Sequence, residues 1–489
     1  MPMLDTHSKT DLLQGAIVVG DDIRLEGEGR MTHVNPATGR EQADFPQASA
    51  RDVDDAVVAA RAAQPVWAGL PAARRQEILR NLSRLMVEQA DEFATINALE
   101  TGTPYAGFRS MIVNRFPAWF DYYAGWIEKL HGDTIDLDPG RAFLFTTKEP
   151  VGVVAKILTW NGPLNNIYMA VAPALAAGCA VVIKPPELAP FGAIRFGKLC
   201  REAGFPAGTV SVLPGGAATG DALTRHPGID KISFTGGPAT ARIIGANTAQ
   251  TITPLVLELG GKSAHIVFPD ADLDSVVAQQ TAFCRLAGQV CTSPTRLLVH
   301  DEIYDETVAR VKAAYEAITV GDPFDPNVIM GPVISEGARD RILGMIDRAL
   351  ADGATLATGG GRLGGDLADG FFVPPTLLTN AAHDSEISQE EVFGPVVTIS
   401  RFSTAEEAIA IANDSQFGLA GFVHTRDINK ALWAASKLDA GTIGINGGAS
   451  PASYAAPFGG VRNSGYGREG GREGIEEFLR VKTINVALS

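Results

Sequence analysis

Residues 151–162 read Val-Gly-Val-Val-Ala-Lys-Ile-Leu-Thr-Trp-Asn-Gly, an apolar run that ends in polar residues and a glycine. Similar apolar runs recur up to residue 258, and stretches with helical periodicity separate them. We expect strands near 152–158, 180–184, 209–213, 231–235 and 255–258, with helices near 164–177, 190–203, 217–226 and 238–249. Strands that alternate with helices are typical of a parallel sheet covered by helices. The sequence therefore predicts a Rossmann-like layout of the kind that binds dinucleotides.

The turns after these strands are candidates for phosphate binding. The usual Gly-x-Gly-x-x-Gly fingerprint is missing, and Gly215-Gly216-Ala-Ala-Thr-Gly220 imitates it only loosely, so we interpret that stretch as a turn. The stretch Phe234-Thr235-Gly236-Gly237-Pro238 is a better candidate, because it ends a strand and opens a helix with proline in the first turn. Backbone N–H groups at such a helix start can bind a pyrophosphate.

Charged side chains follow two of the predicted strands. Lys184 and Glu187 lie in Lys-Pro-Pro-Glu after the run 180–183, and Glu258 ends the run 254–257, just before two glycines. Enzymes with α/β folds place reactive groups at the carboxyl edge of the sheet. The simpler interpretations are a solvated ion pair for Lys184 and Glu187, and an exposed carboxylate for Glu258.

Cys291 is the candidate nucleophile. It lies in Ala287-Gly288-Gln289-Val290-Cys291-Thr292, where Gly288 suits an open turn. A thiol and a carboxylate base are the pair that an enzyme needs to form a thioester and then hydrolyse it. The alternative is that Cys291 is a small core residue, one of four cysteines. Because the cysteines are few and lack metal-ligand spacing, we expect reduced thiols, a cytoplasmic location and no metal site.

Seven short motifs, in the same order and over nearly the whole chain, resemble those of the NAD(P)-dependent aldehyde dehydrogenases. They are Thr159-Trp160-Asn161, Lys184-Pro185-Pro186-Glu187, Phe234-Thr235-Gly236-Gly237, Leu257 to Lys262, Gly288 to Cys291, Glu391-Val392-Phe393-Gly394-Pro395 and Pro457-Phe458-Gly459-Gly460. The resemblance implies an α/β aldehyde dehydrogenase fold in three parts. These are a Rossmann-like cofactor domain (1–125 and 150–257), an α/β catalytic domain (258–450) and a small β oligomerisation element (126–149 and 470–489).

The resemblance also assigns roles to residues. Cys291 attacks the aldehyde, Asn161 and the Cys291 N–H stabilise the oxyanion of the thiohemiacetal, hydride leaves for NAD, and Glu258 activates the water that hydrolyses the thioester. Glu187 accepts hydrogen bonds from the adenosine ribose and repels a 2′-phosphate, which favours NAD and leaves NADP as a secondary cofactor. The implied cofactor-binding residues are Thr159, Trp160, Lys184, Glu187, Gly236, Gly237, Gly260, Glu391 and Phe393.

The sequence departs from the family pattern at two positions. The family often carries serine where this chain has Gly237, so one hydroxyl contact to phosphate is missing while the backbone cradle remains. Nine positions after Asn161, a lysine that takes part in a proton relay with a C-terminal glutamate is replaced by Ala170. Because Glu469 still matches that glutamate, we expect an altered relay, through water to Glu258.

The substrate is the least determined feature. The residues expected to shape the substrate tunnel are Gly162, Asn165, Asn166, Met169, Tyr454 and Phe458. Aromatic residues near the tunnel favour an apolar or aromatic aldehyde. Arg285 favours the alternative of an acidic semialdehyde, as in the succinate-semialdehyde branch. A CoA-acylating enzyme needs no base at Glu258, and a non-catalytic relative would be expected to lack Cys291 or Asn161.

Composition narrows the class of protein. At 489 residues the chain is longer than one core usually supports, so several domains are expected. A formal charge of −15 argues against a nucleic-acid partner, and no uninterrupted apolar window reaches the ~18 residues of a membrane span. The C-terminal residues 481–488 have strand character, and the family resemblance predicts that they join the oligomerisation sheet of a homodimer or homotetramer.

Overall fold

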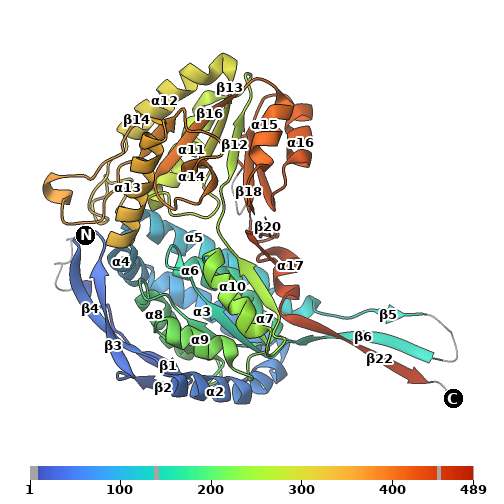
Figure 1. Cartoon of the computed structure of the whole chain (residues 1–489). Helices are drawn as coiled ribbons and strands as arrows, with labels where there is room; N and C mark the ends of the chain where they lie inside the picture. Colours follow the sequence, from blue (N-terminus) through green and yellow to red (C-terminus); the bar gives the residue numbers. More distant parts are fainter. Residues whose placement is uncertain (1–8, 137–141, 449–452, 488–489) are drawn as a thin grey trace.

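The computed structural model describes residues 9–136, 142–448 and 453–487. Two separate sheets, each covered by helices, form the lower and upper halves of the molecule in Figure 1, and a narrow arm of strands projects from the lower half. This is the expected α/β architecture, and most strand pairings in both sheets are parallel.

The lower sheet has eight strands in the order β2-β1-β9-β8-β7-β10-β11-β21. The strands are β1 (Ile17–Val19), β2 (Asp22–Arg24), β7 (Val153–Ile157), β8 (Ala180–Lys184), β9 (Val210–Val212), β10 (Lys231–Thr235), β11 (Leu255–Glu258) and β21 (Gly465–Tyr466). The five predicted strands are β7 to β11, and all four pairings among them are parallel. The antiparallel neighbours β1 and β21 come from distant parts of the chain.

The helices of the lower half include those that the sequence predicts between residues 164 and 249. The helices are α2 (Ala50–Gly69), α3 (Ala72–Glu88), α4 (Ala90–Thr101), α5 (Tyr105–Ala124), α6 (Pro163–Asn166), α7 (Ala172–Ala177), α8 (Phe191–Ala203), α9 (Ala217–Arg225) and α10 (Pro238–Thr248). The expected helix 164–177 contains a π-helical turn, η2 (Ile167–Val171), between α6 and α7. Such turns are rare and frequently lie at functional sites.

The upper sheet has seven strands in the order β14-β15-β16-β13-β12-β18-β19. They are β12 (Ala264–Val267), β13 (Arg296–His300), β14 (Thr355–Thr358), β15 (Thr376–Thr379), β16 (Val396–Phe402), β18 (Ala420–His424) and β19 (Thr442–Ile445). The accompanying helices are α11 (Leu273–Ala282), α12 (Tyr304–Glu316), α13 (Glu336–Ala351), α14 (Glu386–Gln389), α15 (Ala405–Asn413) and α16 (Ile428–Lys437).

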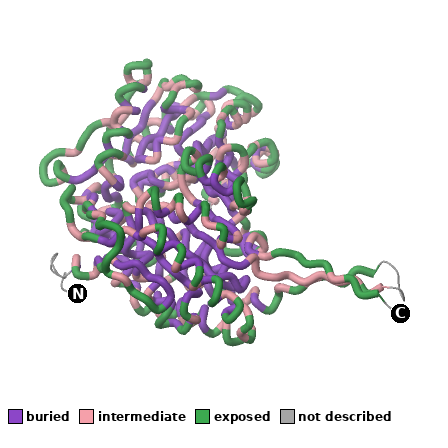
Figure 2. The backbone as a smooth tube through the Cα atoms, turned by 60° about the horizontal axis from the view of Figure 1, so that its bottom comes forward, coloured by how far each residue is buried: buried purple, intermediate pink, exposed green. Residues whose placement is uncertain are grey.

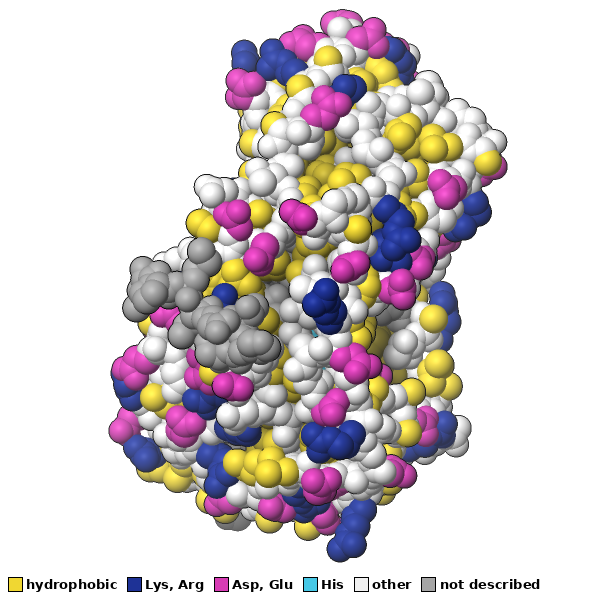
Figure 3. All heavy atoms as spheres, turned by 90° about the vertical axis from the view of Figure 1, so that its left-hand side faces the viewer, with side chains coloured by type: hydrophobic (Ala, Val, Ile, Leu, Met, Phe, Trp, Pro, Cys, Tyr) yellow, Lys and Arg dark blue, Asp and Glu magenta, His cyan; other side chains and the backbone are white. Residues whose placement is uncertain are grey.

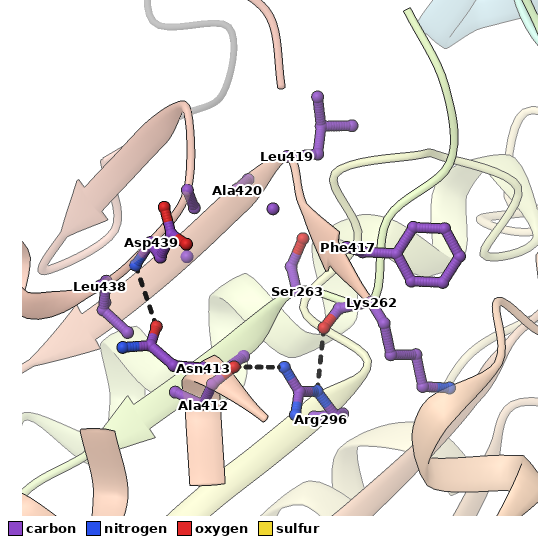
Figure 4. Close-up of a pocket in the computed structure, with 14 residues that line it drawn as sticks. Lys262, Ser263, Arg296, Ala412, Asn413, Phe417, Leu419, Ala420, Leu438 and Asp439 are labelled. Atoms are coloured by element: carbon purple, nitrogen blue, oxygen red, sulfur yellow. Dashed lines mark hydrogen bonds between the residues drawn. The ribbon is translucent and has the colours of Figure 1, made fainter. Parts of the chain in front are cut away.

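A buried arginine ties the start of the upper sheet together. The Arg296 guanidinium donates hydrogen bonds to the backbone oxygens of Lys262, Ile411 and Ala412. Figure 4 shows two of these bonds beside a cavity of about 20 Å³, where the Asp439 N–H also donates to Asn413. Because Arg296 donates its hydrogen bonds to backbone carbonyls, we interpret the residues around this cavity as part of the framework of the upper sheet.

The arm consists of β6 (Ala142–Pro150) and β22 (Leu479–Ala487), which pair antiparallel along their whole length, with β5 (Thr134–Ile135) beside β6. Figure 2 shows the arm in the colours of intermediate and exposed residues, whereas the two halves have buried interiors. Its exposed apolar side chains include Phe143, Val481 and Val486.

The remaining described elements are short or lie outside the two main sheets. They are β3 (Gly29–Asn35), β4 (Arg40–Gln47), η1 (Ile127–Lys129), η3 (Phe283–Leu286), η4 (Asp301–Ile303), η5 (Gly365–Leu367), β17 (Phe417–Gly418), β20 (Val461–Arg462) and α17 (Gly471–Glu476). Among the described residues, none of the helices is both long and apolar enough to span a membrane, and no cluster of His, Cys, Asp and Glu has the form of a metal site. On the face in Figure 3, acidic and basic side chains are interspersed.

Candidate active site

The loop of Cys291 and the stretch after Glu258 pack against each other where the two sheets meet. Gly288 has a φ of +69°, and a Cβ there would lie 2.1 Å from the backbone oxygen of Gly394. A Cβ on Gly261 would lie 2.5 Å from the backbone oxygen of Cys291. Because real Cβ atoms do not approach other atoms so closely, glycine at both positions allows the nucleophile loop to pack against its neighbours.

Cys291 borders a cavity. A cavity of about 190 Å³ is lined by Cys291 together with Glu258, Asn161 and Glu391. Burial raises the pKa of the Cys291 thiol to about 12, and the carboxyls of Glu391 and Glu258 add to the rise. The other three cysteines, Cys179, Cys200 and Cys284, are fully buried. The structure thus brings together the three residues predicted to be catalytic.

Asn161 is held against the nucleophile loop. Its Nδ2 donates a hydrogen bond to the backbone oxygen of Gln289 at 2.8 Å. Gln289 is fixed in turn, since its Oε1 accepts a hydrogen bond from the Ile334 N–H at 2.9 Å. A side-chain amide carries two N–H groups, and no residue in the described ranges accepts the second one from Asn161. That N–H can therefore serve a substrate oxygen.

Glu258 is buried without a hydrogen-bond partner on either carboxyl oxygen among the described residues. Burial raises the pKa of Glu258 well above its ordinary value, and the neighbouring Glu469 raises it further, whereas Lys156 and Arg468 lower it. Glu469, for which the sequence predicts an altered relay, pairs with Lys156 at 3.0 Å. A buried carboxyl with free lone pairs can accept a proton from water.

A larger cavity of about 470 Å³ continues from the first along the carboxyl edge of the lower sheet. The two cavities share Thr159, Trp160, Thr235, Gly236 and Gly237. The larger one also includes Lys184 and Glu187, two of the residues predicted to bind the cofactor. The predicted cofactor residues therefore line one continuous groove. It also contains residues that the sequence did not single out, namely Asp221, Thr240, Ile243, Ile244 and Asn247.

The acidic end of the groove is built around Glu187. Lys184 Nζ donates to Glu187 Oε2 at 3.2 Å, and burial lowers the pKa of Lys184 despite this carboxylate. A Cβ on Gly216 would lie 3.6 Å from Glu187 Oε1. The stretch Gly215–Gly220, interpreted from the sequence as a plain turn, thus opens α9 beside the predicted ribose site. The loose glycine pattern was the signal that could have identified it.

Glu391 and Phe393 lie at the other end of the groove, beside the nucleophile. Glu391 Oε1 accepts a hydrogen bond from the Gly261 N–H at 3.0 Å, and burial raises the pKa of Glu391 to about 7. A Cβ on Gly260 would lie 2.2 Å from Glu391 Oε2, so glycine at this position leaves room for the carboxyl. The rings of Phe393 and Trp160 meet edge to face at a centroid distance of 5.2 Å.

A separate cavity of about 220 Å³ lies over the aromatic helix α5 and η2. It is lined by Asn114, Arg115, Ala118, Trp119, Tyr168, Ser453 and Tyr454. Trp119 and Tyr168 belong to the same hydrophobic cluster as Met169 and Phe458, and Cys291 packs against this cluster. Of the residues predicted to shape the tunnel, Tyr454 lines this cavity. Arg285 is exposed and lines neither this cavity nor that of Cys291.

Comparison with known proteins agrees with this arrangement. The model of the aldehyde dehydrogenase family matches residues 24–484. Retinal dehydrogenase 2 of Homo sapiens is 41% identical over 480 residues, covering 96% of this chain and 92% of the relative. Hydroxyisobutyraldehyde dehydrogenase of Mycolicibacterium austroafricanum is 41% identical, covering 99% and 95%.

Solved structures agree as well. Betaine aldehyde dehydrogenase of Staphylococcus aureus in complex with NAD⁺ superposes with a TM-score of 0.95 at 37% identity, covering 99% of this chain and 97% of that one. The family model, the related sequences and the solved structures agree with the site geometry. The chain therefore belongs to the aldehyde dehydrogenase family and is an enzyme that oxidises aldehydes.

Proposed function

We propose that the enzyme uses NAD to oxidise an aldehyde to its carboxylic acid through a thioester on Cys291. The observation that carries this proposal is the meeting of Cys291, Asn161, Glu258 and Glu391 around one cavity. NAD is supported by the groove that continues from this cavity, and by the NAD⁺ complex of the Staphylococcus aureus relative. Glu258 counts against a CoA-acylating enzyme, which would need no base to activate water.

In the first half of the reaction, Cys291 Sγ attacks the aldehyde carbon. The carbonyl oxygen becomes an oxyanion, to which Asn161 Nδ2 and the Cys291 N–H donate hydrogen bonds. When bound, NAD supplies the hydride acceptor and a positively charged ring, which favours the Cys291 thiolate. Such a charge is needed, because burial, Glu391 and Glu258 all raise the pKa of the thiol.

In the second half, water must attack the thioester. Glu258 takes a proton from this water as it attacks, and the carbon–sulfur bond breaks to release the carboxylic acid and the Cys291 thiolate. The buried carboxyl of Glu258 makes no hydrogen bond with the described residues, so its lone pairs can face the attacking water. Its raised pKa makes it a strong base once it is ionised.

Glu187 is proposed to select NAD over NADP. A carboxylate at the end of β8 would accept hydrogen bonds from the ribose hydroxyls and repel a 2′-phosphate. Asp221, which also lines this cavity, adds negative charge. Glu187→Ser should therefore improve the use of NADP relative to NAD, and an unchanged ratio would contradict the assignment.

The division of the chain into domains is likewise proposed. Residues 1–125 and 150–257 would bind the cofactor, because β1, β2 and β7 to β11 share one sheet. Residues 258–450 would form the catalytic domain around the second sheet. Residues 126–149 and 470–489 would form the oligomerisation element of a homodimer or homotetramer, for which the projecting arm is the support.

The substrate is proposed to be an apolar or aromatic aldehyde. Trp119, Tyr168 and Tyr454 line the cavity over α5 and favour aromatic and aliphatic groups. Arg115 in the same cavity favours a second candidate, an aldehyde with a distal carboxylate. Arg115→Ala should lower kcat/KM selectively for such substrates, whereas Arg285→Ala, at an exposed position outside this cavity, should not.

The test is NADH formation by purified enzyme with NAD and a panel of acetaldehyde, benzaldehyde, citral, decanal and succinate semialdehyde. The Cys291→Ala variant should form no NADH with any of them. Turnover that survives in this variant would overturn the thioester mechanism. The aldehyde with the highest kcat/KM decides between the two substrate classes.

A further inference from the structure

Three neighbouring strands of the lower sheet place four polar side chains on one face. In the register of the sheet, Lys156 on β7 lies opposite Ser233 on β10, and Thr235 on β10 lies opposite Glu258 on β11. Ser233 and Thr235 are two residues apart, so their side chains point to the same face. Adjacent strands are only about 4.8 Å apart, and β10 alone separates β7 from β11. The long side chain of Lys156 can therefore reach across β10 towards the carboxyl of Glu258.

The ammonium of Lys156 is held in a defined position. It donates to Ser233 Oγ at 3.1 Å, to Thr235 Oγ1 at 2.9 Å and to Glu469 Oε1 at 3.0 Å. The Lys156 side chain is 1% exposed and that of Glu469 is 4% exposed. A charged pair so deeply buried is costly to form, and its attraction must repay the desolvation of both groups. Its position beside Glu258 suggests a purpose other than stability.

Glu469 is fixed next to the carboxyl of Glu258 by its own backbone. Its N–H and C=O both pair with Phe458, and the following residue, Gly459, approaches Glu258. A Cβ on Gly459 would lie 2.8 Å from Glu258 Oε1. The charged or titratable groups around this cluster are Lys156, Glu469, Arg468, Glu477 and Lys231, which pairs with Glu477, together with Cys291, Glu391, Tyr123 and Tyr168.

We propose, on the basis of the function proposed above, that Lys156 is a positioning residue for thioester hydrolysis, whose buried ammonium allows Glu258 to give up its proton and act as base. Glu469 holds the ammonium in place and opposes part of its effect, since a second carboxylate favours the protonated form of Glu258. The pair therefore sets the pH at which hydrolysis begins. Lys156 does not contact the substrate in this proposal.

The proposal makes opposite predictions for the two members of the pair. The acidic limb is the low-pH side of the pH–rate profile, where hydrolysis speeds up as Glu258 loses its proton. Lys156→Met removes the positive charge, so this limb should move to higher pH. Glu469→Gln removes the negative charge, so the limb should move to lower pH. A shift of one pH unit changes the rate about tenfold on the limb. A merely structural role for the pair would impair both variants in the same way.

The hydrolysis step can be isolated from cofactor chemistry. An activated ester, p-nitrophenyl acetate, transfers its acetyl group to Cys291 and releases nitrophenolate. After excess ester is removed, loss of the acetyl mass from the protein is followed by mass spectrometry over a range of pH. Glu258→Gln, which should abolish the acidic limb, first establishes that the limb reports on Glu258. Lys156→Arg keeps the positive charge, so its acidic limb should lie at the same pH as that of the wild type.

Limbs that shift in opposite directions for Lys156→Met and Glu469→Gln, with Lys156→Arg close to wild type, would support the proposal. Limbs that coincide with wild type, or that move together, would overturn it. If Lys156→Met does not fold, Glu469→Gln alone still decides, because its limb must move to lower pH. An enzyme that forms no NADH with any aldehyde, or whose limb persists in Glu258→Gln, would instead refute the proposed function itself.

Discussion

Gly260→Ala should weaken cofactor binding and leave the fold intact. A Cβ at this position would lie 2.2 Å from Glu391 Oε2 and 2.7 Å from its Cδ, which are atoms at the flexible end of a side chain. The backbone of Gly260 is not in the left-handed region, so it accepts alanine without strain. The new methyl group should therefore displace the carboxyl of Glu391 and leave the main chain where it is.

The size of the effect follows from the contacts that Glu391 loses. Its carboxyl leaves the Gly261 N–H, to which it is bonded at 3.0 Å, and leaves its predicted cofactor-binding position in the cavity of Cys291. A hydrogen bond to a charged group contributes about 1.5–3 kcal/mol, and each 1.4 kcal/mol is a factor of ten in affinity. We expect NAD to bind about 10- to 150-fold more weakly to the variant.

Gly237→Ala is the matched control. It makes the same substitution in the same groove, but a Cβ there meets nothing within 4 Å. The dissociation constant of NAD is measured by titration calorimetry for both variants and the wild type, and the thermal unfolding midpoint checks the fold. Gly237→Ala should bind NAD nearly as well as the wild type. Wild-type affinity in Gly260→Ala would refute the role of Glu391 and the packing argument with it.

Three further predictions follow from buried carboxyls. Glu258→Gln should keep a single-turnover burst of NADH while steady-state turnover falls about 10²- to 10⁴-fold, and loss of the burst would contradict its role as the base in hydrolysis. Because burial raises the pKa of Glu391 to about 7, NAD affinity in calorimetry should increase as the pH rises through that value, and Glu391→Gln should remove the dependence. Burial also raises the pKa of Glu100, which accepts hydrogen bonds from the Phe191 and Gly192 N–H groups, to about 8. The folded state then holds a proton that the unfolded state releases above its ordinary pKa. This contribution to the free energy of unfolding is fully present below pH 4.5 and is lost as the pH rises to 8. The loss is of the order of 5 kcal/mol. The thermal midpoint should therefore fall less over this range in Glu100→Gln than in the wild type.

Local pattern predicted the strands that lie in the middle of the lower sheet. The structure has strands at 231–235 and 255–258, as expected. The first alternates polar and apolar residues, the second is an apolar run, and each ends at a polar residue and is followed by glycines. The antiparallel strands β1 and β21 at either side were not predicted as members of this sheet. Their pairing joins segments that are distant along the chain, and hydrophobic periodicity carries no information about such contacts.

Residues of the active site were likewise predictable from the sequence only where a local motif contains them. Cys291, Glu258 and Asn161 could be predicted because each lies in a short motif that keeps its residues at fixed spacing. Lys156 could not, because in the sequence it is a lone lysine within an apolar strand, and its partner Glu469 is 313 positions away. The groove residues Thr240 and Ile243 were also missed, since on α10 they read as ordinary positions of an amphipathic helix.

The family pattern often has a lysine where this chain has Ala170, and in the structure another lysine pairs with Glu469. Ala170 is buried in η2, but a cation reaches Glu469 from a different element, the strand β7. Lys156 can do so because residues in register on β7, β10 and β11 share a face, and because Gly459 leaves room beside Glu258. On the proposal above, a positive charge must be kept at one place in the sheet, and more than one strand or helix can supply it. A lysine introduced at position 170 of a Lys156→Met variant should then bring the acidic limb of hydrolysis back towards wild type.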